Sequence, residues 1–338
     1  MTVADWLLDS DPSVRWQALQ DLAGAPADVV AAERARVVTN GWGRRLLALR
    51  GEDGQWAGGA YFPGQGGGSD VGPSDGAGTP DSPEDSGGPE GAGEGVQPWT
   101  ATTYSLLQLR DFGVDPDNDQ IRRTVALVRD NCRWEEGGQP YFTGEVEPCI
   151  NGMAVRLGAY FGQDVDGVVA RLVNEQLEDG GWNCWAEYGA VVSSAATTIN
   201  VLEGLLAHEQ STGGSAESIE ARQRGEEYLL ERRLFRRKSN GKVIDPAWLE
   251  FSFPTRWHYD VLRALDYFRS AGGPPDLRLA EAIELLRSKR QADGTWLLEN
   301  THPGQVHFEL EDGDGRPSRW NTLRALRVLR WYEGGMPP

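Results

Sequence analysis

The sequence predicts an all-α fold built from repeated helical hairpins. A short signature, Asp-Gly-x-Trp, occurs at residues 53–56, 179–182 and 293–296. Each copy follows a stretch in which apolar residues recur at helical spacing, which predicts a helix. The glycine after this stretch can adopt the left-handed backbone conformation that commonly ends a helix. Tryptophans also recur in successive loops, about every 45 to 50 residues once a glycine-rich insert is set aside, which indicates one repeated unit. These loop residues are Trp56, Trp134, Trp182, Trp248 and Trp296.

The first element is an amphipathic helix that begins at Asp11-Pro12. Aspartate is a favoured N-cap residue, and proline is favoured at the first helical position. The stretch resembles one helix of a HEAT repeat. We therefore predict that residues 1–39 form HEAT-like N-terminal capping helices and that residues 40–338 form the repeat domain.

Outer helices of the hairpins are predicted where apolar residues line one helical face. The clearest stripe begins at Val165 and continues through Val168, Val169 and Leu172. Similar stripes in residues 121–132 and 279–286 precede Trp134 and Trp296. A more apolar inner helix follows each tryptophan loop, beginning near residues 99, 151, 195, 257 and 320. Residues 64–97 interrupt this pattern with seven acids, no bases and many glycines, so we predict a disordered insert there.

Composition limits the classes of partner. The chain has 33 basic and 51 acidic residues and a net charge of -18, which argues against nucleic acid as a partner. Three scattered cysteines are too few for a disulfide framework and favour a reducing compartment. No secretory signal and no run of about 18 apolar residues is present. We expect a cytoplasmic protein without a transmembrane segment; the sequence leaves its oligomeric state open.

Two copies of the signature extend backwards to a glutamine, at Gln176 and Gln291. In this form they resemble the QW repeats of terpene cyclases. The resemblance covers roughly residues 40 to 332 and extends to squalene-hopene cyclases, oxidosqualene cyclases and protein prenyltransferase β subunits. It implies an (α/α)6-type toroid of inner and outer helices around an apolar central cavity, with an isoprenoid or a polycyclic molecule as the ligand. The five hairpins and the N-terminal helices predicted above agree with such a ring.

Aromatic residues gather in and near the loops that lead into the inner helices, and in such a ring these loops share one mouth. Aromatic faces stabilise cations and bind flat apolar ligands, although packing between hairpins would also explain them. The residues predicted to bind substrate are Tyr61, Phe62, Trp99, Tyr104, Tyr141, Phe142, Trp185, Tyr188, Phe253, Trp257 and Trp320.

A zinc site is implied by the same resemblance. Glu147 and Cys149 lie at the start of one inner helix, and His258 lies at the start of a later one. Protein prenyltransferase β subunits bind zinc through an acid, a cysteine two residues later and a histidine at such a later position; here Glu147 replaces the usual aspartate. A carboxylate, a thiolate and an imidazole with one open position suit catalytic Zn²⁺. Alternatively, Cys149 is a small buried apolar residue.

Acid–base chemistry is a further interpretation of these residues. Glu147, His258 and Asp260 are candidates for proton transfer, although the Asp-x-Asp-Asp motif of squalene-type cyclases does not occur. The sequence leaves several functions open. They are terpene cyclase-like isomerase or lyase chemistry, a zinc-dependent prenyltransferase-like reaction, noncatalytic binding of an apolar ligand, and glycoside hydrolysis by Glu147 and Glu187.

Overall fold

The computed structural model describes residues 2–64 and 98–335, and within them the chain is mostly helical, so the predicted all-α class is confirmed. Apart from Gly64, the predicted insert at 64–97 lies outside the described residues. The helices are α1 (Val3–Leu8), α2 (Pro12–Asp21), α3 (Ala27–Ala35), α4 (Gly41–Ala48), α5 (Thr102–Phe112), α6 (Asp119–Asn131), α7 (Pro148–Tyr160), α8 (Asp166–Asn174), α9 (Ala195–Thr212), α10 (Ala216–Glu231), α11 (Val261–Ala271), α12 (Ala280–Ser288) and α13 (Arg319–Gly335). Two short strands, β1 (Trp296–Leu297) and β2 (Pro317–Ser318), pair antiparallel.

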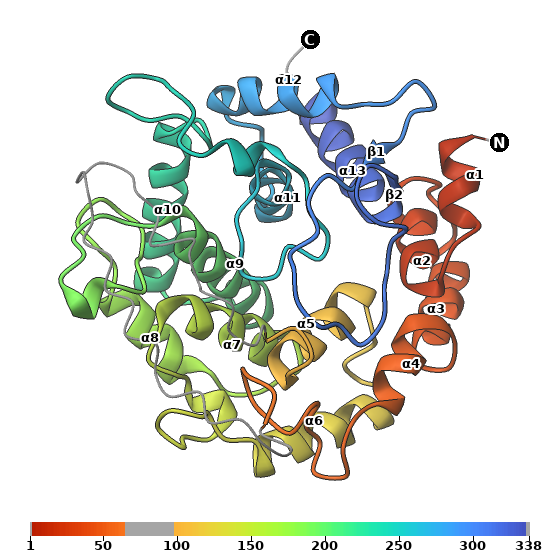
Figure 1. Cartoon of the computed structure of the whole chain (residues 1–338), viewed down its shortest axis with the longest axis vertical. Helices are drawn as coiled ribbons and strands as arrows, with labels where there is room; N and C mark the ends of the chain where they lie inside the picture. Colours follow the sequence, from red (N-terminus) through yellow and green to blue (C-terminus); the bar gives the residue numbers. More distant parts are fainter. Residues whose placement is uncertain (1, 65–97, 336–338) are drawn as a thin grey trace. The chain divides into compact units, whose positions relative to one another are not determined.

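The chain divides into two compact units. The first unit consists of Met1–Leu49, Leu107–Ile121 and Leu229–Pro338, and the second consists of Arg50–Leu106 and Arg122–Tyr228. Both units are therefore discontinuous in sequence. Three of the boundaries between the units fall inside α5, α6 and α10, and Figure 1 shows these helices along the chain.

In the first unit, helices from the two ends of the chain pack together. Helix α2 contacts α13, where the Arg327 guanidinium donates to Gln17 Oε1 at 2.8 Å and pairs with Asp21. Helix α13 also packs beside α11, and both bury leucines, among them Leu262 and Leu323. The segment predicted as HEAT-like thus shares its core with the last helix of the chain.

In the second unit, α7 and α9 lie side by side (Figure 1) and approach closely. Glycine makes this approach possible, because a Cβ atom on Gly152 would lie 2.4 Å from the carbonyl oxygen of Asn200. A Cβ atom on Gly204 would lie equally close to the carbonyl oxygen of Gly152. The two helices therefore meet backbone to backbone, and their relative position is fixed without intervening side chains.

The three Asp-Gly-x-Trp turns share one local structure. Their glycines have positive φ, and their indoles are fully buried. In each turn the tryptophan backbone N–H donates to the Oγ1 atom of a threonine in the first turns of the next helix, at 2.9 to 3.1 Å. The pairs are Trp56 with Thr102, Trp182 with Thr198, and Trp296 with Thr322.

The indole N–H groups of two of these tryptophans donate to carbonyl oxygens of the helix that precedes the turn. Trp182 donates to the carbonyl oxygen of Leu172 at 2.7 Å, and Trp296 donates to that of Leu286 at 2.8 Å. Each of these two turns therefore fixes the end of one helix to the beginning of the next, as expected for a structural motif. Among the residues that the structure describes, no helix is both long and apolar enough to cross a membrane.

Candidate functional site

The candidate site of the second unit begins at the first turn of α7. Glu147 is the N-cap residue of this helix with an extended backbone, and Pro148 occupies its first position. A residue before proline favours this extended conformation, and proline favours the start of a helix. The sequence Glu147-Pro148-Cys149 therefore places a carboxylate just outside the helix and a thiol in its first turn.

The loop before α7 is fixed by its own hydrogen bonds. The Asn151 side chain accepts from the backbone N–H of Glu145 at 2.7 Å and donates to the Glu145 carbonyl oxygen at 2.8 Å. The Glu145 carboxylate in turn accepts from the backbone N–H of Glu147 at 2.8 Å. Burial raises the pKa of Glu145, while this backbone hydrogen bond opposes the shift. These contacts hold the backbone at Glu147 in one position.

A second thiol reaches the same place from the loop before α9. Cys184 follows Trp182, whose turn is fixed to Thr198 of α9. The Asn183 side chain donates to the carbonyl oxygen of Val192 at 2.8 Å and closes this loop. The Cys184 sulfur also lies 3.4 Å from the hydroxyl oxygen of Thr197.

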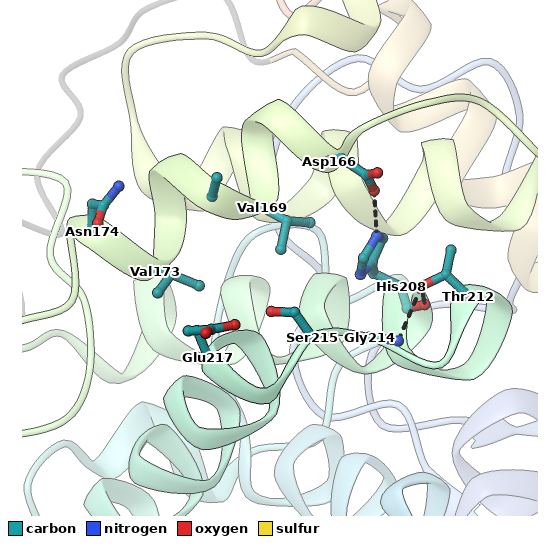
Figure 2. A pocket seen from close by; sticks show the side chains of 10 residues that line it. Asp166, Val169, Val173, Asn174, His208, Thr212, Gly214, Ser215 and Glu217 are labelled. Atoms are coloured by element: carbon teal, nitrogen blue, oxygen red, sulfur yellow. Dashed lines mark hydrogen bonds and ion pairs between the residues drawn. The ribbon is translucent and has the colours of Figure 1, made fainter.

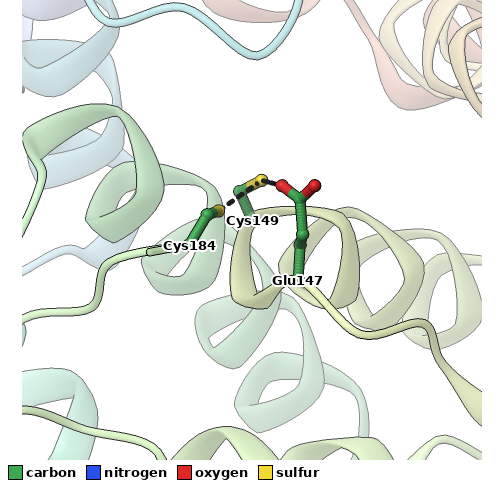
Figure 3. A group of neighbouring side chains, drawn as sticks. All are labelled: Glu147, Cys149 and Cys184. Atoms are coloured by element: carbon green, nitrogen blue, oxygen red, sulfur yellow. Dashed lines mark hydrogen bonds between the residues drawn. The ribbon is translucent and has the colours of Figure 1, made fainter. Parts of the chain in front are cut away.

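Figure 3 shows that Glu147, Cys149 and Cys184 converge. The Cys149 thiol donates to Glu147 Oε2 at 3.4 Å, and the sulfur atoms of Cys149 and Cys184 are 2.9 Å apart. One ligand atom from each of the three residues lies within 4.8 Å of the other two. Glu147 is exposed and both cysteines are half-buried, so the group is open to solvent on one side.

This donor set fits a soft divalent metal ion. Zinc binds thiolate sulfur at about 2.3 Å and carboxylate oxygen at about 2.0 to 2.2 Å, so the ligand atoms of a tetrahedral ion lie about 3.6 to 3.8 Å apart. The two sulfur atoms, 2.9 Å apart, would have to separate by about 1 Å to meet this, which side-chain rotation supplies. Three protein ligands would leave the fourth position of a tetrahedral ion open, as in catalytic zinc sites.

The protonation of the thiols bears on metal binding. The hydrogen bond from Cys184, burial and the neighbouring Glu147 carboxylate raise the pKa of Cys149 well above its ordinary value. Cys149 is therefore a neutral thiol at pH 7. Binding of a metal ion would release its proton.

Four of the predicted substrate-binding aromatics form one cluster in the second unit. The Tyr104 hydroxyl donates to the Tyr61 hydroxyl at 2.8 Å, and the Tyr104 ring meets the edge of Trp99 with centroids 4.9 Å apart. Phe62 contacts Tyr61 with centroids 5.0 Å apart and is 48% exposed. Burial and the hydroxyl of Tyr104 raise the pKa of Tyr61, and Cys149 and Glu147 add to the shift, so this cluster lies near the thiol site.

Four further predicted aromatics of this unit behave in two ways. Tyr141 is fully buried, stacks on Trp134, and is within hydrogen-bonding distance of Thr103; Phe142 packs against it. Trp185 and Tyr188 lie one and four residues after Cys184 in the chain, and they are 47% and 75% exposed. Their rings are 5.5 Å apart. The exposed side chains among the predicted aromatics of this unit are thus Phe62, Trp185 and Tyr188.

The remaining predicted residues belong to the first unit. Phe253 stacks on Trp320 with centroids 4.5 Å apart, and Trp257 stacks on His258 at 3.8 Å. His258 in turn stacks on His302 at 3.6 Å. Burial, then the nearby His302 and Arg263, lowers the pKa of His258 to about 2, so this imidazole is neutral.

Asp260 has a local structural role. Its carboxylate accepts from the backbone N–H of Arg263 at 2.7 Å and from the Ser252 hydroxyl at 2.8 Å, and it is the N-cap residue of α11. Aspartate is among the preferred residues at this position. The predicted acid–base group therefore divides between the units, with Glu147 in the second and His258 and Asp260 in the first.

Cys184 is the residue of this site that sequence patterns do not single out. It lies two residues after the tryptophan of the second signature, in a loop that leads into an inner helix, and this position was the available signal. Its proximity to Cys149 depends on the packing of α7 against α9, which spacing along the chain does not disclose.

A separate cleft of about 600 Å³ lies between α8, the end of α9 and the start of α10 (Figure 2). His208 Nε2 lies 2.8 Å from the exposed Asp166 carboxylate, and Val169 and Val173 supply an apolar wall. None of the residues predicted to bind substrate or metal lines this cleft.

Comparison with known proteins adds no further assignment, since no protein-family model and no curated protein matches the chain.

Proposed function

We propose that this chain is a metal-dependent enzyme that binds Zn²⁺ through Glu147, Cys149 and Cys184 and acts on an apolar substrate of the isoprenoid type. The observation that carries the proposal is the convergence of one carboxylate and two thiols within 4.8 Å. We further propose that the hairpins form an α/α toroid of the terpene cyclase and prenyltransferase kind. The shared hydrogen bonding of the three Asp-Gly-x-Trp turns supports this architecture.

Each residue of the site has a distinct task in this proposal. The three ligands hold the ion, and the Thr197 hydroxyl, 3.4 Å from the Cys184 sulfur, orients that ligand. A bound zinc ion supplies a Lewis acid that lowers the pKa of a coordinated thiol or water. The exposed rings of Phe62, Trp185 and Tyr188 offer an apolar surface for the substrate beside the ion.

Metal analysis of untagged protein tests the proposal. Because the three donors form one site, we expect about one zinc per chain. Zinc binding should be lost in Cys149→Ser and Cys184→Ser and weakened in Glu147→Gln. Titration with cobalt(II) should give a sulfur-to-metal charge-transfer band that is absent from both cysteine variants. Cys132→Ala is the matched control, because Cys132 is fully buried and is not among the grouped ligands. Full metal content in the two serine variants would refute the site.

A second candidate, noncatalytic binding of an apolar ligand, is favoured by one observation. Phe62, Trp185, Tyr188 and Val191 are all exposed large apolar residues of the second unit. Binding of a fluorescent isoprenoid analogue that is equally tight with and without zinc, and that is never turned over, would select this alternative.

A further inference from the structure

The two cysteines of the candidate metal site come from different segments of the second unit. Cys149 lies in the first turn of α7 and Cys184 in the loop before α9, 35 residues later in the chain. Both are free thiols, both are half-buried, and their sulfur atoms are 2.9 Å apart (Figure 3). They are therefore accessible to a small reagent and close to each other at the same time.

We infer that Cys149 and Cys184 form a reversible intramolecular disulfide. The sulfur atoms of a disulfide are about 2.0 Å apart, so the pair has to approach by less than about 1 Å. Side-chain rotation supplies a movement of this size. The backbone contact of α7 with α9 at Gly152 and Gly204 keeps the two segments together while the bond forms and breaks.

The reaction requires an oxidant, and a low-molecular-weight disulfide such as glutathione disulfide suffices. The thiolate of one cysteine attacks a sulfur of the small disulfide, which forms a mixed disulfide and releases one small thiolate. The second cysteine thiolate then attacks the protein sulfur of that mixed disulfide and releases the other. The protein loses two protons and two electrons, and the small disulfide becomes two thiols after protonation.

The disulfide would regulate metal binding at the proposed site, and this part of the inference rests on the proposed function. A sulfur atom in a disulfide is no longer a thiolate, and thiolate is the form that binds the metal ion. The bridged protein would therefore lack two of its three ligands. Zinc in turn would shield both sulfurs from the oxidant, so metal binding and disulfide formation exclude each other.

Cys132 offers an internal comparison. It is the third free cysteine and it is fully buried, so a dissolved disulfide cannot reach its sulfur atom. It should not react under conditions in which the other two do.

The test uses the full chain, stripped of metal by a chelator and equilibrated with mixtures of reduced and oxidised glutathione. After the remaining thiols are alkylated, mass spectrometry should find one Cys149–Cys184 bridge in the wild type and in Cys132→Ala. Cys149→Ser and Cys184→Ser should instead carry one mixed disulfide with glutathione on the cysteine that remains. Absence of the bridge in folded wild-type protein with oxidised glutathione in excess would overturn the inference, as would its loss in Cys132→Ala.

A parallel sample with zinc separates this inference from the proposed function. A bridge that forms at the same rate with zinc present, together with no bound zinc, leaves the disulfide standing and removes the metal site. Bound zinc with no bridge in the metal-free sample removes the disulfide and leaves the metal site standing.

Discussion

Acidification should destabilise the first unit through the stacked histidines. The rings of His258 and His302 are 3.6 Å apart and nearly parallel, at 7°. Burial is the main cause that lowers both pKa values, to about 2 for His258 and about 4 for His302, from 6.5. The nearby Arg256 and Arg263 lower both further, whereas Asp314 opposes the shift at His302.

The sign of the effect follows from where the protons bind. Below pH 6.5 the unfolded chain protonates both histidines, whereas the folded chain keeps them neutral. The free energy of unfolding is therefore unaffected by this pair above pH 6.5 and falls as the pH drops from 6.5 toward 4. One pKa unit corresponds to about 1.4 kcal/mol, so at pH 5 each histidine costs about 2 kcal/mol and the pair about 4 kcal/mol.

Urea unfolding at pH 7.5 and pH 5 measures this change. The wild type should lose stability on acidification, and the double variant His258→Gln/His302→Gln should lose about 4 kcal/mol less, because neither glutamine titrates. His307→Gln, outside the stack, is the control and should follow the wild type. An equal loss in the double variant and the wild type would refute the reasoning, since other groups would then carry the pH dependence.

Three further predictions concern the second unit. Gly152→Ala should lower the free energy of unfolding by more than about 2 kcal/mol, because the new Cβ atom would lie 2.4 Å from the Asn200 carbonyl oxygen. Gly167→Ala, in α8 with open space at the Cβ position, is its control and should gain up to about 1 kcal/mol; equal effects would contradict the packing argument. Trp182→Phe should lower the free energy of unfolding in urea by about 1 to 3 kcal/mol, in addition to the effect of the smaller contact area, because the buried carbonyl oxygen of Leu172 loses its hydrogen-bond donor. An unchanged urea midpoint would contradict this prediction. Oxidation that bridges the two site cysteines, 35 residues apart, should stabilise the metal-free chain by about 3 to 4 kcal/mol in the chain-entropy model, and a lower melting temperature after oxidation would show strain instead.

Local features of the fold could be predicted from the sequence. The outer helix expected from Val165 is observed as α8, which begins at Asp166 and ends at Asn174. It ends before Leu177 because the Gln176 side chain donates to the carbonyl oxygens of Gly180 and Ala221, which bends the chain into the tryptophan turn. The apolar periodicity and the glycine of the Asp-Gly-x-Trp turn therefore locate helix α8. Its last residue also depends on the hydrogen bond from Gln176 to Ala221, 45 residues later in the chain.

The candidate site was only partly predictable for the same reason. Glu147 and Cys149 are two residues apart at a helix start, and that pairing can be seen in the sequence. Cys184 joins them only because α7 and α9 meet through glycine, and no local pattern encodes that contact. The structural role of Asp260, by contrast, can be predicted from local sequence. Aspartate directly before an apolar helical stretch is a strong N-cap signal, and Asp260 is the N-cap residue of α11.

The pairing of α2 with α13 has a consequence for biosynthesis. Every residue of the second unit, Arg50–Leu106 and Arg122–Tyr228, leaves the ribosome before the final segment, Leu229–Pro338, is complete. Domains usually fold from the N-terminus during synthesis, but here the first helices have to wait for the last one. The part of the chain made first should therefore finish folding last, and until then α2 exposes the surface that Arg327 and its neighbours later cover.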